Sequence, residues 1–180
     1  IGIPTCNAEE MKILAFSDAA LSNLPDKTSS TRSFVIFVFA MGRVVPLSWC
    51  SKKLERVAKT IIYAEGIALG KCLDEAVNLR QALFDMMNLT NREGTTGLIP
   101  IVGITDSKSL WENIHSTTQA DDLKLRREVA SIKEQISLKE VADVKWVPTQ
   151  LQLADSLTKS TAPTAPLIHV LTTGQFNIDL

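Results

Sequence analysis

The sequence predicts an α/β fold, with a mixed five-stranded sheet flanked by helices. Segments with strand-like composition come first, and later ones alternate with segments whose apolar residues recur every three or four positions. The predicted order is β, β, β, α, β, α, α, β, α. The first three strands are joined by short turns and should be antiparallel, whereas the two strands that follow helices can run parallel to the first.

The first three elements are predicted to be strands. Residues 11–18 (MKILAFSD) should form the centre of the sheet, because both faces of this strand are largely apolar. Residues 31–40 (TRSFVIFVFA) are rich in β-branched and aromatic residues, and residues 44–50 return after a short turn. Pro46 fits an edge strand, because proline has no backbone N–H to donate.

The rest of the chain is predicted to be mainly helical. Residues 52–89 have the periodicity of one long helix, in which Gly66 or Gly70 could produce a kink. The elements that follow are a strand at 99–106, helices at 107–115 and 120–137, a strand at 141–147 and a short helix at 150–159. Residues 161–180 contain Pro163, Pro166 and Gly174 and are expected to form an irregular tail.

The composition fits one globular domain of 180 residues, with 45% hydrophobic and 22% charged residues. The net charge of −1 argues against binding nucleic acid by bulk charge alone, but allows a local basic patch. No apolar run reaches the ~20 residues that span a bilayer, and no membrane contact is expected. Cys6, Cys50 and Cys72 lack CxxC spacing, which favours free thiols in a reducing compartment over a zinc site.

Four acids are placed where chemistry is expected. Asp18 and Asp106 each end an apolar strand, Glu65 lies in an apolar stretch of the long helix, and Asp155 lies among apolar residues in QLADSLTK. Ligands of open α/β sheets bind at the carboxyl ends of parallel strands, so Asp18 and Asp106 should be neighbours. Clustered carboxylates need cations, and two Mg²⁺ ions roughly 3.5–4 Å apart suit phosphodiester hydrolysis.

Each acid also has a simpler interpretation. Asp18 could cap the loop that follows it, and Glu65 could be a surface acid of the helix. Asp106 could cap the helix that begins at the next residue. Asp155 could interact with the dipole of its own short helix. Considered one at a time, the acids leave these alternatives open.

Five motifs follow one another along the chain: SDA at 17–19, SWCSKK at 48–53, AEGIAL at 64–69, TDSKSL at 105–110 and WVPTQLQLADSLTK at 146–159. In order and spacing they resemble the ribonuclease H domain of copia-type LTR retrotransposon Pol polyproteins, and QLADSLTK is the most specific. The resemblance implies a ribonuclease H-like fold and cleavage of the RNA strand of RNA–DNA hybrids during reverse transcription. It also implies that Asp18, Glu65, Asp106 and Asp155 are the catalytic acids and bind two Mg²⁺ ions, or Mn²⁺, with Asp18 bridging both.

The resemblance also suggests the context of the domain. Residues 1–10 would be a lead-in from a preceding reverse transcriptase region, residues 11–160 the ribonuclease H domain and residues 161–180 the tail. The start of the chain, without Met or a signal-like layout, fits a fragment of a longer protein. The expected partners are an RNA–DNA hybrid and the reverse transcriptase domain of the same polyprotein. The expected location is the cytoplasm, in a virus-like particle, with the nucleus as the alternative.

Substrate contacts are predicted around the acids. Lys52, Lys53, Arg56 and Lys59 cluster at the predicted start of the long helix and could hold DNA-strand phosphates; a solvated helix face is the alternative. Ser107 is a candidate for contact with the 2′-hydroxyls of the RNA strand.

Other features are predicted to be structural, or depart from the family pattern. Trp49, Trp111 and Trp146 are expected to pack in the core rather than to stack on bases. Gly66 stands where the family usually has a larger residue, and Gln150 stands where many ribonucleases H carry a histidine.

The alternative function is a catalytically silent domain that binds nucleic acid or supports an adjoining polymerase. A third is another nuclease or an integrase of the same superfamily.

Overall fold

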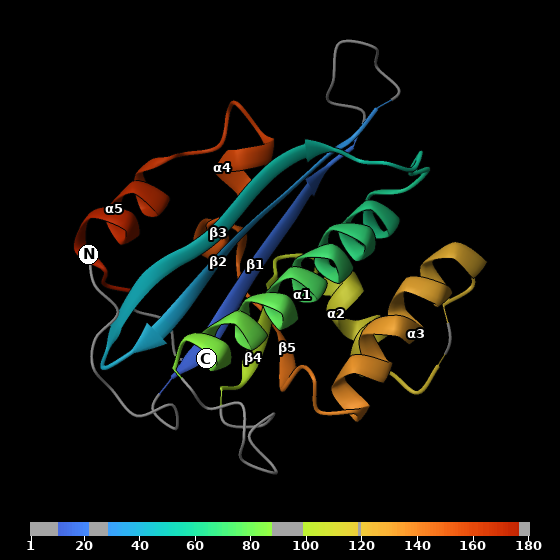
Figure 1. The fold of residues 1–180 in the computed structure, drawn as a ribbon. Coiled ribbons are helices and arrows are strands. Elements are labelled where there is room, and N and C mark those ends of the chain that lie inside the picture. Colours follow the sequence, from blue (N-terminus) through green and yellow to red (C-terminus); the bar gives the residue numbers. More distant parts are fainter. Residues whose placement is uncertain (1–10, 22–28, 88–98, 119, 177–180) are drawn as a thin grey trace.

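The computed structural model describes residues 11–21, 29–87, 99–118 and 120–176. Five strands form one sheet in the order β3-β2-β1-β4-β5 (Figure 1). They are β1 (Lys12–Ala20), β2 (Thr31–Ala40), β3 (Arg43–Lys53), β4 (Ile101–Thr105) and β5 (Asp143–Trp146). Strands β1, β2 and β3 pair antiparallel, whereas β4 pairs parallel with β1 and β5 pairs parallel with β4. The predicted mixed sheet is therefore confirmed.

Strand β1 lies at the centre of the sheet, as its two apolar faces predicted. Ile13 and Ala15 are buried in one hydrophobic cluster, whereas Leu14 and Phe16 are buried in another on the opposite face. Successive strand residues point to opposite faces, so both faces of β1 are covered. A polar side chain at the end of this strand is therefore also held inside the protein.

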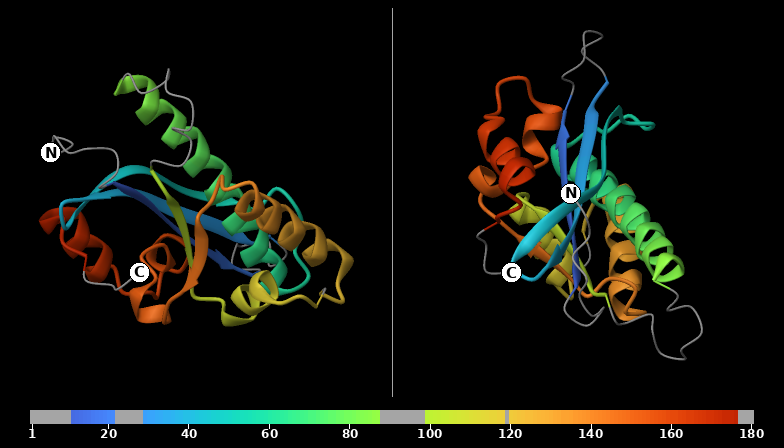
Figure 2. Two further views of the ribbon diagram at one scale, coloured as in Figure 1. Left: turned by 90° about the horizontal axis from the view of Figure 1, so that it is seen from below. Right: turned by 60° about the vertical axis from the view of Figure 1, so that its left-hand side comes forward.

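Helices cover the two faces of the sheet (Figure 2). Helices α1 (Ile61–Met86), α2 (Lys108–His115) and α3 (Leu123–Ser137) contribute to the first cluster. On the other face lie α4 (Asp155–Thr158) and α5 (Ala165–Thr173), with the 3₁₀ turn η3 (Thr149–Leu151) before them. The single short helix predicted at 150–159 is thus a 3₁₀ turn followed by a separate helix. Within the described residues, no helix is long and apolar enough to cross a membrane.

The predicted start of the long helix is wrong. Strand β3 continues to Lys53, because residues 43–53 pair with β2 almost throughout, and α1 begins only at Ile61. The side chain of Thr60 accepts a hydrogen bond from the Tyr63 backbone at 3.4 Å, which caps the helix. The basic residues assigned to the start of the helix therefore lie on the end of β3 and in the loop that follows.

Pro46 lies in an edge strand, and Gly66 does not interrupt its helix. Pro46 is in the edge strand β3, as predicted, next to a register shift where the β2 partner changes from Ile36 to Phe37. Helix α1 is continuous through Gly66. A Cβ at this glycine would lie 3.6 Å from Leu125 and Glu128 side-chain atoms, which is an ordinary contact distance, so the packing of α1 against α3 does not require glycine there.

The prediction of an irregular tail is wrong for Ala165–Thr173, which form α5. Pro166 lies in the first turn of α5, where proline is tolerated, and Gly174 ends the helix with a left-handed φ of 67°. The two residues interpreted as helix breakers are thus its start and stop signals. Leu167 and Val170 anchor the helix in the second hydrophobic cluster.

The prediction that all three tryptophans pack in the core is wrong for two of them. Trp49 is 68% exposed and Trp146 is 42% exposed. Both lie on edge strands, β3 and β5, where one side of the strand has no neighbour in the sheet. Trp111 is partly buried against the first cluster, and its indole N–H donates to the Val144 carbonyl at 3.1 Å.

Candidate active site

Three of the predicted acids form one compact group. Carboxylate oxygens of Asp18, Glu65 and Asp106, one from each residue, all lie within 4.8 Å of one another. Asp18 is 0% exposed and Glu65 is 5% exposed, whereas Asp106 is half-buried. A cleft of about 410 Å³ opens beside the group, and Glu65, Asp106 and Ser107 are among the residues that line it.

The topology explains why these acids meet. Strands β1 and β4 are parallel neighbours, and Phe16 is paired with Ile104. Asp18 and Asp106 each follow these paired residues by two positions, so they lie at the same edge of the sheet. Glu65 is one turn into α1, on the side of the helix that is buried. The interpretation of Glu65 as a surface acid is therefore wrong. The loop that Asp18 was suggested to cap lies mostly outside the described residues, and the described partners of Asp18 are Thr158 and Lys159.

Asp155 reaches the group through a lysine. The Lys159 ammonium forms a close ion pair with Asp155 and lies 3.4 Å from Asp18 Oδ1. The Thr158 hydroxyl donates a short hydrogen bond to Asp18 Oδ2. The structure thus brings Asp155 to the neighbourhood of Asp18, but the group of three that could share one ion leaves it out.

Side-chain hydrogen bonds between the sheet and the segment that carries Asp155 hold this segment in place. Ser33 Oγ donates to the Ala154 carbonyl at 2.8 Å, and Ser51 Oγ donates to the Leu157 carbonyl at 2.6 Å. Gln152 Nε2 donates to the Ser17 carbonyl at 3.0 Å, directly next to Asp18 in the chain. Gln152 of the LQLAD segment therefore has a structural role, because together with Ser33 and Ser51 of the sheet it holds α4 over the end of β1.

The environment raises the pKa of both buried acids. Burial is the main cause for Asp18, whose pKa rises to about 6 although Thr158 and Lys159 oppose the rise. Burial, followed by the charges of Asp18 and Asp106, raises the pKa of Glu65 well above its ordinary value. Burial alone would lower the pKa of Lys159, but the hydrogen bond to Asp155 and the charge of Asp18 outweigh it and raise this pKa. The group is therefore short of positive charge.

The donor set fits a divalent cation. All three groups are carboxylates, which are the hard oxygen ligands that Mg²⁺ and Mn²⁺ prefer. Glu65 Oε2 is buried and has no hydrogen-bond partner, which is costly for a polar atom unless a ligand completes its environment. Asp18, Glu65 and Asp106 would hold such an ion together.

The predicted substrate-binding residues lie around the same edge of the sheet. Ser107 lines the cleft. Lys52 is paired with Arg32, which is paired with Ala19, so Lys52 is two strands, or about 10 Å, from the end of β1. Lys53 is exposed at the end of β3.

Arg56 and Lys59 are exposed in the loop before α1. Arg56 forms an ion pair with Glu128 of α3 at 3.1 Å, which directs this side chain toward α3. Gln150, at the position where many ribonucleases H carry a histidine, is exposed in η3. The substrate roles of these residues stay predictions.

Three residues near the acids were not assigned to the site from the sequence. Thr158 and Lys159 follow Asp155 by three and four positions, which on a helix places all three on one side, and this spacing was the available signal. Trp146 lies beside the group, because its indole N–H donates to the Asp106 carbonyl at 3.0 Å. Nothing in the sequence indicated that contact.

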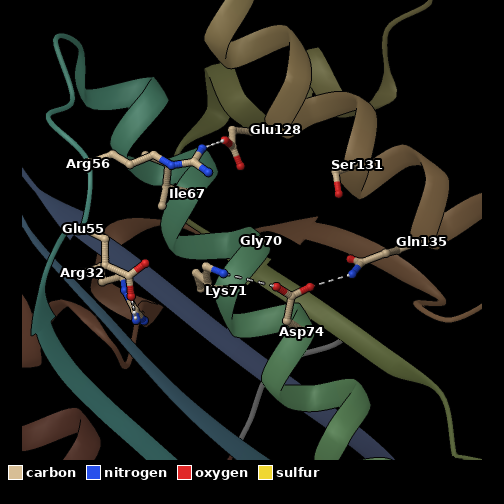
Figure 3. Close-up of a pocket in the computed structure, with 10 residues that line it drawn as sticks. All are labelled: Arg32, Glu55, Arg56, Ile67, Gly70, Lys71, Asp74, Glu128, Ser131 and Gln135. Atoms are coloured by element: carbon tan, nitrogen blue, oxygen red, sulfur yellow. Dashed lines mark hydrogen bonds and ion pairs between the residues drawn. The ribbon is translucent and has the colours of Figure 1, made fainter.

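A second pocket, of about 240 Å³, lies between α1, α3, the start of β2 and the loop after β3 (Figure 3). Its three cationic side chains each face an acid: Arg32 with Glu55, Arg56 with Glu128, and Lys71 with Asp74. None of the four predicted catalytic acids lines it. Because its charges are paired, this pocket is a weaker candidate for catalysis than the cleft.

Comparison with solved structures identifies the fold. The N-terminal RNase H domain of rv2228c from Mycobacterium tuberculosis, solved as a maltose-binding-protein fusion, matches with a TM-score of 0.56 and 18% identity, over 89% of this chain and 99% of that one. RNase H1 from Halobacterium salinarum matches with a TM-score of 0.56 and 17% identity, over 88% and 98%.

LC11-RNase H1, isolated from compost by a metagenomic approach, was also solved in complex with an RNA/DNA hybrid. That complex matches with a TM-score of 0.53 and 14% identity, over 81% of this chain and 93% of that one. No protein-family model matches the sequence, and the search of curated proteins gave no match. The structural matches agree with the sheet order and the flanking helices described above. The chain therefore has the ribonuclease H fold.

Proposed function

We propose that this chain is a metal-dependent endoribonuclease that cleaves the RNA strand of RNA–DNA hybrids. The observation that carries the proposal is the buried group of Asp18, Glu65 and Asp106 at the carboxyl ends of two parallel strands. The structures that share this fold are ribonucleases H by name, and one of them was solved with an RNA/DNA hybrid. The motifs of the sequence point to the same activity.

The chain's own residues would hold the cations and the substrate. Asp18, Glu65 and Asp106 would hold one ion, and Asp18 with Asp155 would hold a second. When bound, Mg²⁺ or Mn²⁺ would activate a water molecule and stabilise the charge on the leaving oxygen. Ser107, on the wall of the cleft, would contact the RNA strand.

The basic end of β3 would bind the other strand of the hybrid. Lys52 and Lys53 are exposed two strands away from the acids and could contact phosphates without reading sequence. Trp49 is exposed on the same strand. This arrangement allows local charge to bind a nucleic acid although the net charge of the chain is only −1.

We further propose that the domain belongs to a copia-type retrotransposon polyprotein and works beside a reverse transcriptase domain. The motifs SWCSKK and QLADSLTK support this context. In that setting the enzyme would remove RNA during reverse transcription, in a cytoplasmic virus-like particle or in the nucleus. A pull-down between this chain and the adjoining polymerase segment would test the partnership.

The activity is tested by cleavage of a hybrid labelled on the RNA strand, with Mg²⁺, by wild type and Asp106→Asn. Wild type should cut the RNA strand, Asp106→Asn should lose the activity, and a chelator should abolish it. Asp121→Asn removes an exposed acid outside the site and is the matched control. If wild type neither cuts nor binds a divalent ion, the enzyme proposal is wrong and a catalytically silent domain is the better interpretation.

A further inference from the structure

We propose that the Lys159 ammonium occupies the second cation position, between Asp18 and Asp155. The chain would then bind one divalent ion tightly and a second only when the lysine is displaced. The inference rests on the metal site of the proposed function and concerns how that site is filled. The lysine would be the cation present in the metal-free protein, and the two divalent ions would bind with unequal affinities.

The contacts of Lys159 support this assignment. Its Nζ lies 3.4 Å from Asp18 Oδ1 and forms a close ion pair with Asp155 Oδ1. A second divalent ion would need oxygens of the same two acids. The ammonium lies between the oxygens that this ion would need, so the lysine and the second ion cannot occupy the position at the same time.

The remaining acids are left for one ion. Glu65 Oε2 is buried without a hydrogen-bond partner, and Asp106 is half-buried at the cleft. Neither forms a salt bridge with Lys159 among the described residues. The uncompensated charge is therefore concentrated on the side of Glu65 and Asp106, where the first ion should bind together with Asp18.

Lys159 is also placed so that it can leave. Its side chain is 38% exposed, whereas that of Asp18 is 0% exposed, and the lysine lines the cleft. It follows the last residue of α4 and has a flexible four-carbon stem. Displacement would therefore move one side chain toward solvent and leave the buried acids in place. A phosphate group that arrived in the cleft could attract the ammonium in the same direction.

The test is a calorimetric titration of the full chain with Mn²⁺, without nucleic acid, for wild type, Lys159→Gln and Lys159→Arg. Wild type should bind one ion, and Lys159→Gln should bind a second with an affinity at least about tenfold higher than in wild type. Lys159→Arg keeps the charge and should behave like wild type. Lys108→Gln is the matched control, because this exposed lysine is paired only with Glu112 on its own helix in the described structure.

Circular dichroism of each variant shows whether it is folded before it is titrated. Two ions of equal affinity in wild type, unchanged in Lys159→Gln, would overturn the inference but leave the proposed nuclease intact. Failure of every folded protein to bind an ion would overturn the metal site itself, and this inference with it. An increase in affinity in Lys108→Gln as large as in Lys159→Gln would also overturn it, because the effect would then be one of net charge.

Discussion

The buried carboxylate of Asp18 should make the stability of the metal-free protein depend on pH. Burial raises its pKa from 3.8 to about 6. Because the folded state holds this proton more tightly than the unfolded state, the contribution of Asp18 to stability is most favourable below about pH 4 and falls as the pH rises to about 6. At 1.36 kcal/mol per pH unit, the difference between the two pKa values corresponds to about 3 kcal/mol.

The perturbation that isolates this effect is Asp18→Asn, which keeps the shape of the side chain and removes the titration. The free energy of unfolding is measured by urea denaturation with a chelator present, at pH 4 and pH 7. Relative to wild type, the variant should gain about 2–3 kcal/mol between these two values. The exposed control Asp121→Asn should show no such change. An equal pH dependence in wild type and Asp18→Asn would refute the claim that burial raises the pKa of Asp18.

Three further predictions concern the free energy of unfolding, which urea denaturation measures for each variant. Gly66→Ala should raise the stability by up to about 1 kcal/mol, because alanine favours the helix and its Cβ would make only ordinary 3.6 Å contacts. Gly103→Ala should cost about 1–3 kcal/mol, because its Cβ would lie 3.1 Å from a leucine side chain. A more stable Gly103→Ala than Gly66→Ala would contradict this reasoning. Ser33→Ala should cost about 0.5–1.5 kcal/mol, because the Ala154 carbonyl loses one of its two donors and keeps the Leu157 backbone N–H; no loss would mean that this bond does not hold α4. Gly174→Ala should cost about 1–2 kcal/mol, because its φ is 67°, and an unchanged stability would argue against a left-handed end of α5.

The sheet and the positions of the acids could be predicted because they depend on local patterns and on topology. Alternation identified β1 and β2, and the two apolar faces of β1 placed it at the centre of the sheet. Once β1 and β4 are parallel neighbours, Asp18 and Asp106 must lie at the same edge. Only the helix period was then needed to place Glu65 on the buried side of α1.

Features that depend on long-range contacts could not be predicted from the sequence. The periodic pattern of 52–89 did not show that Lys52 and Lys53 pair with β2, because strand pairing joins residues distant in the chain. The position of Lys159 depends on hydrogen bonds such as that of Ser33 to Ala154, which are 121 residues apart. The exposure of Trp49 and Trp146 depends on which strands lie at the edges.

In the metal-free protein, the surroundings of the acids affect their pKa values and supply the contacts of Asp18. Two buried carboxylates have raised pKa values, and a lysine and a threonine contact Asp18. A divalent ion should therefore bind less tightly as the pH falls through about 6, because protons compete for Asp18. It should also stabilise the fold, since it binds the folded state in preference to the unfolded chain.

The most direct test of the central claim is the anomalous scattering of Mn²⁺ in crystals of this protein soaked with the ion. The account predicts a peak bonded to carboxylate oxygens of Asp18, Glu65 and Asp106 together. That result would show that the group binds a divalent ion through all three acids. The account would be contradicted if crystals soaked in saturating Mn²⁺ showed no peak at these oxygens, or if the Glu65 side chain pointed to solvent.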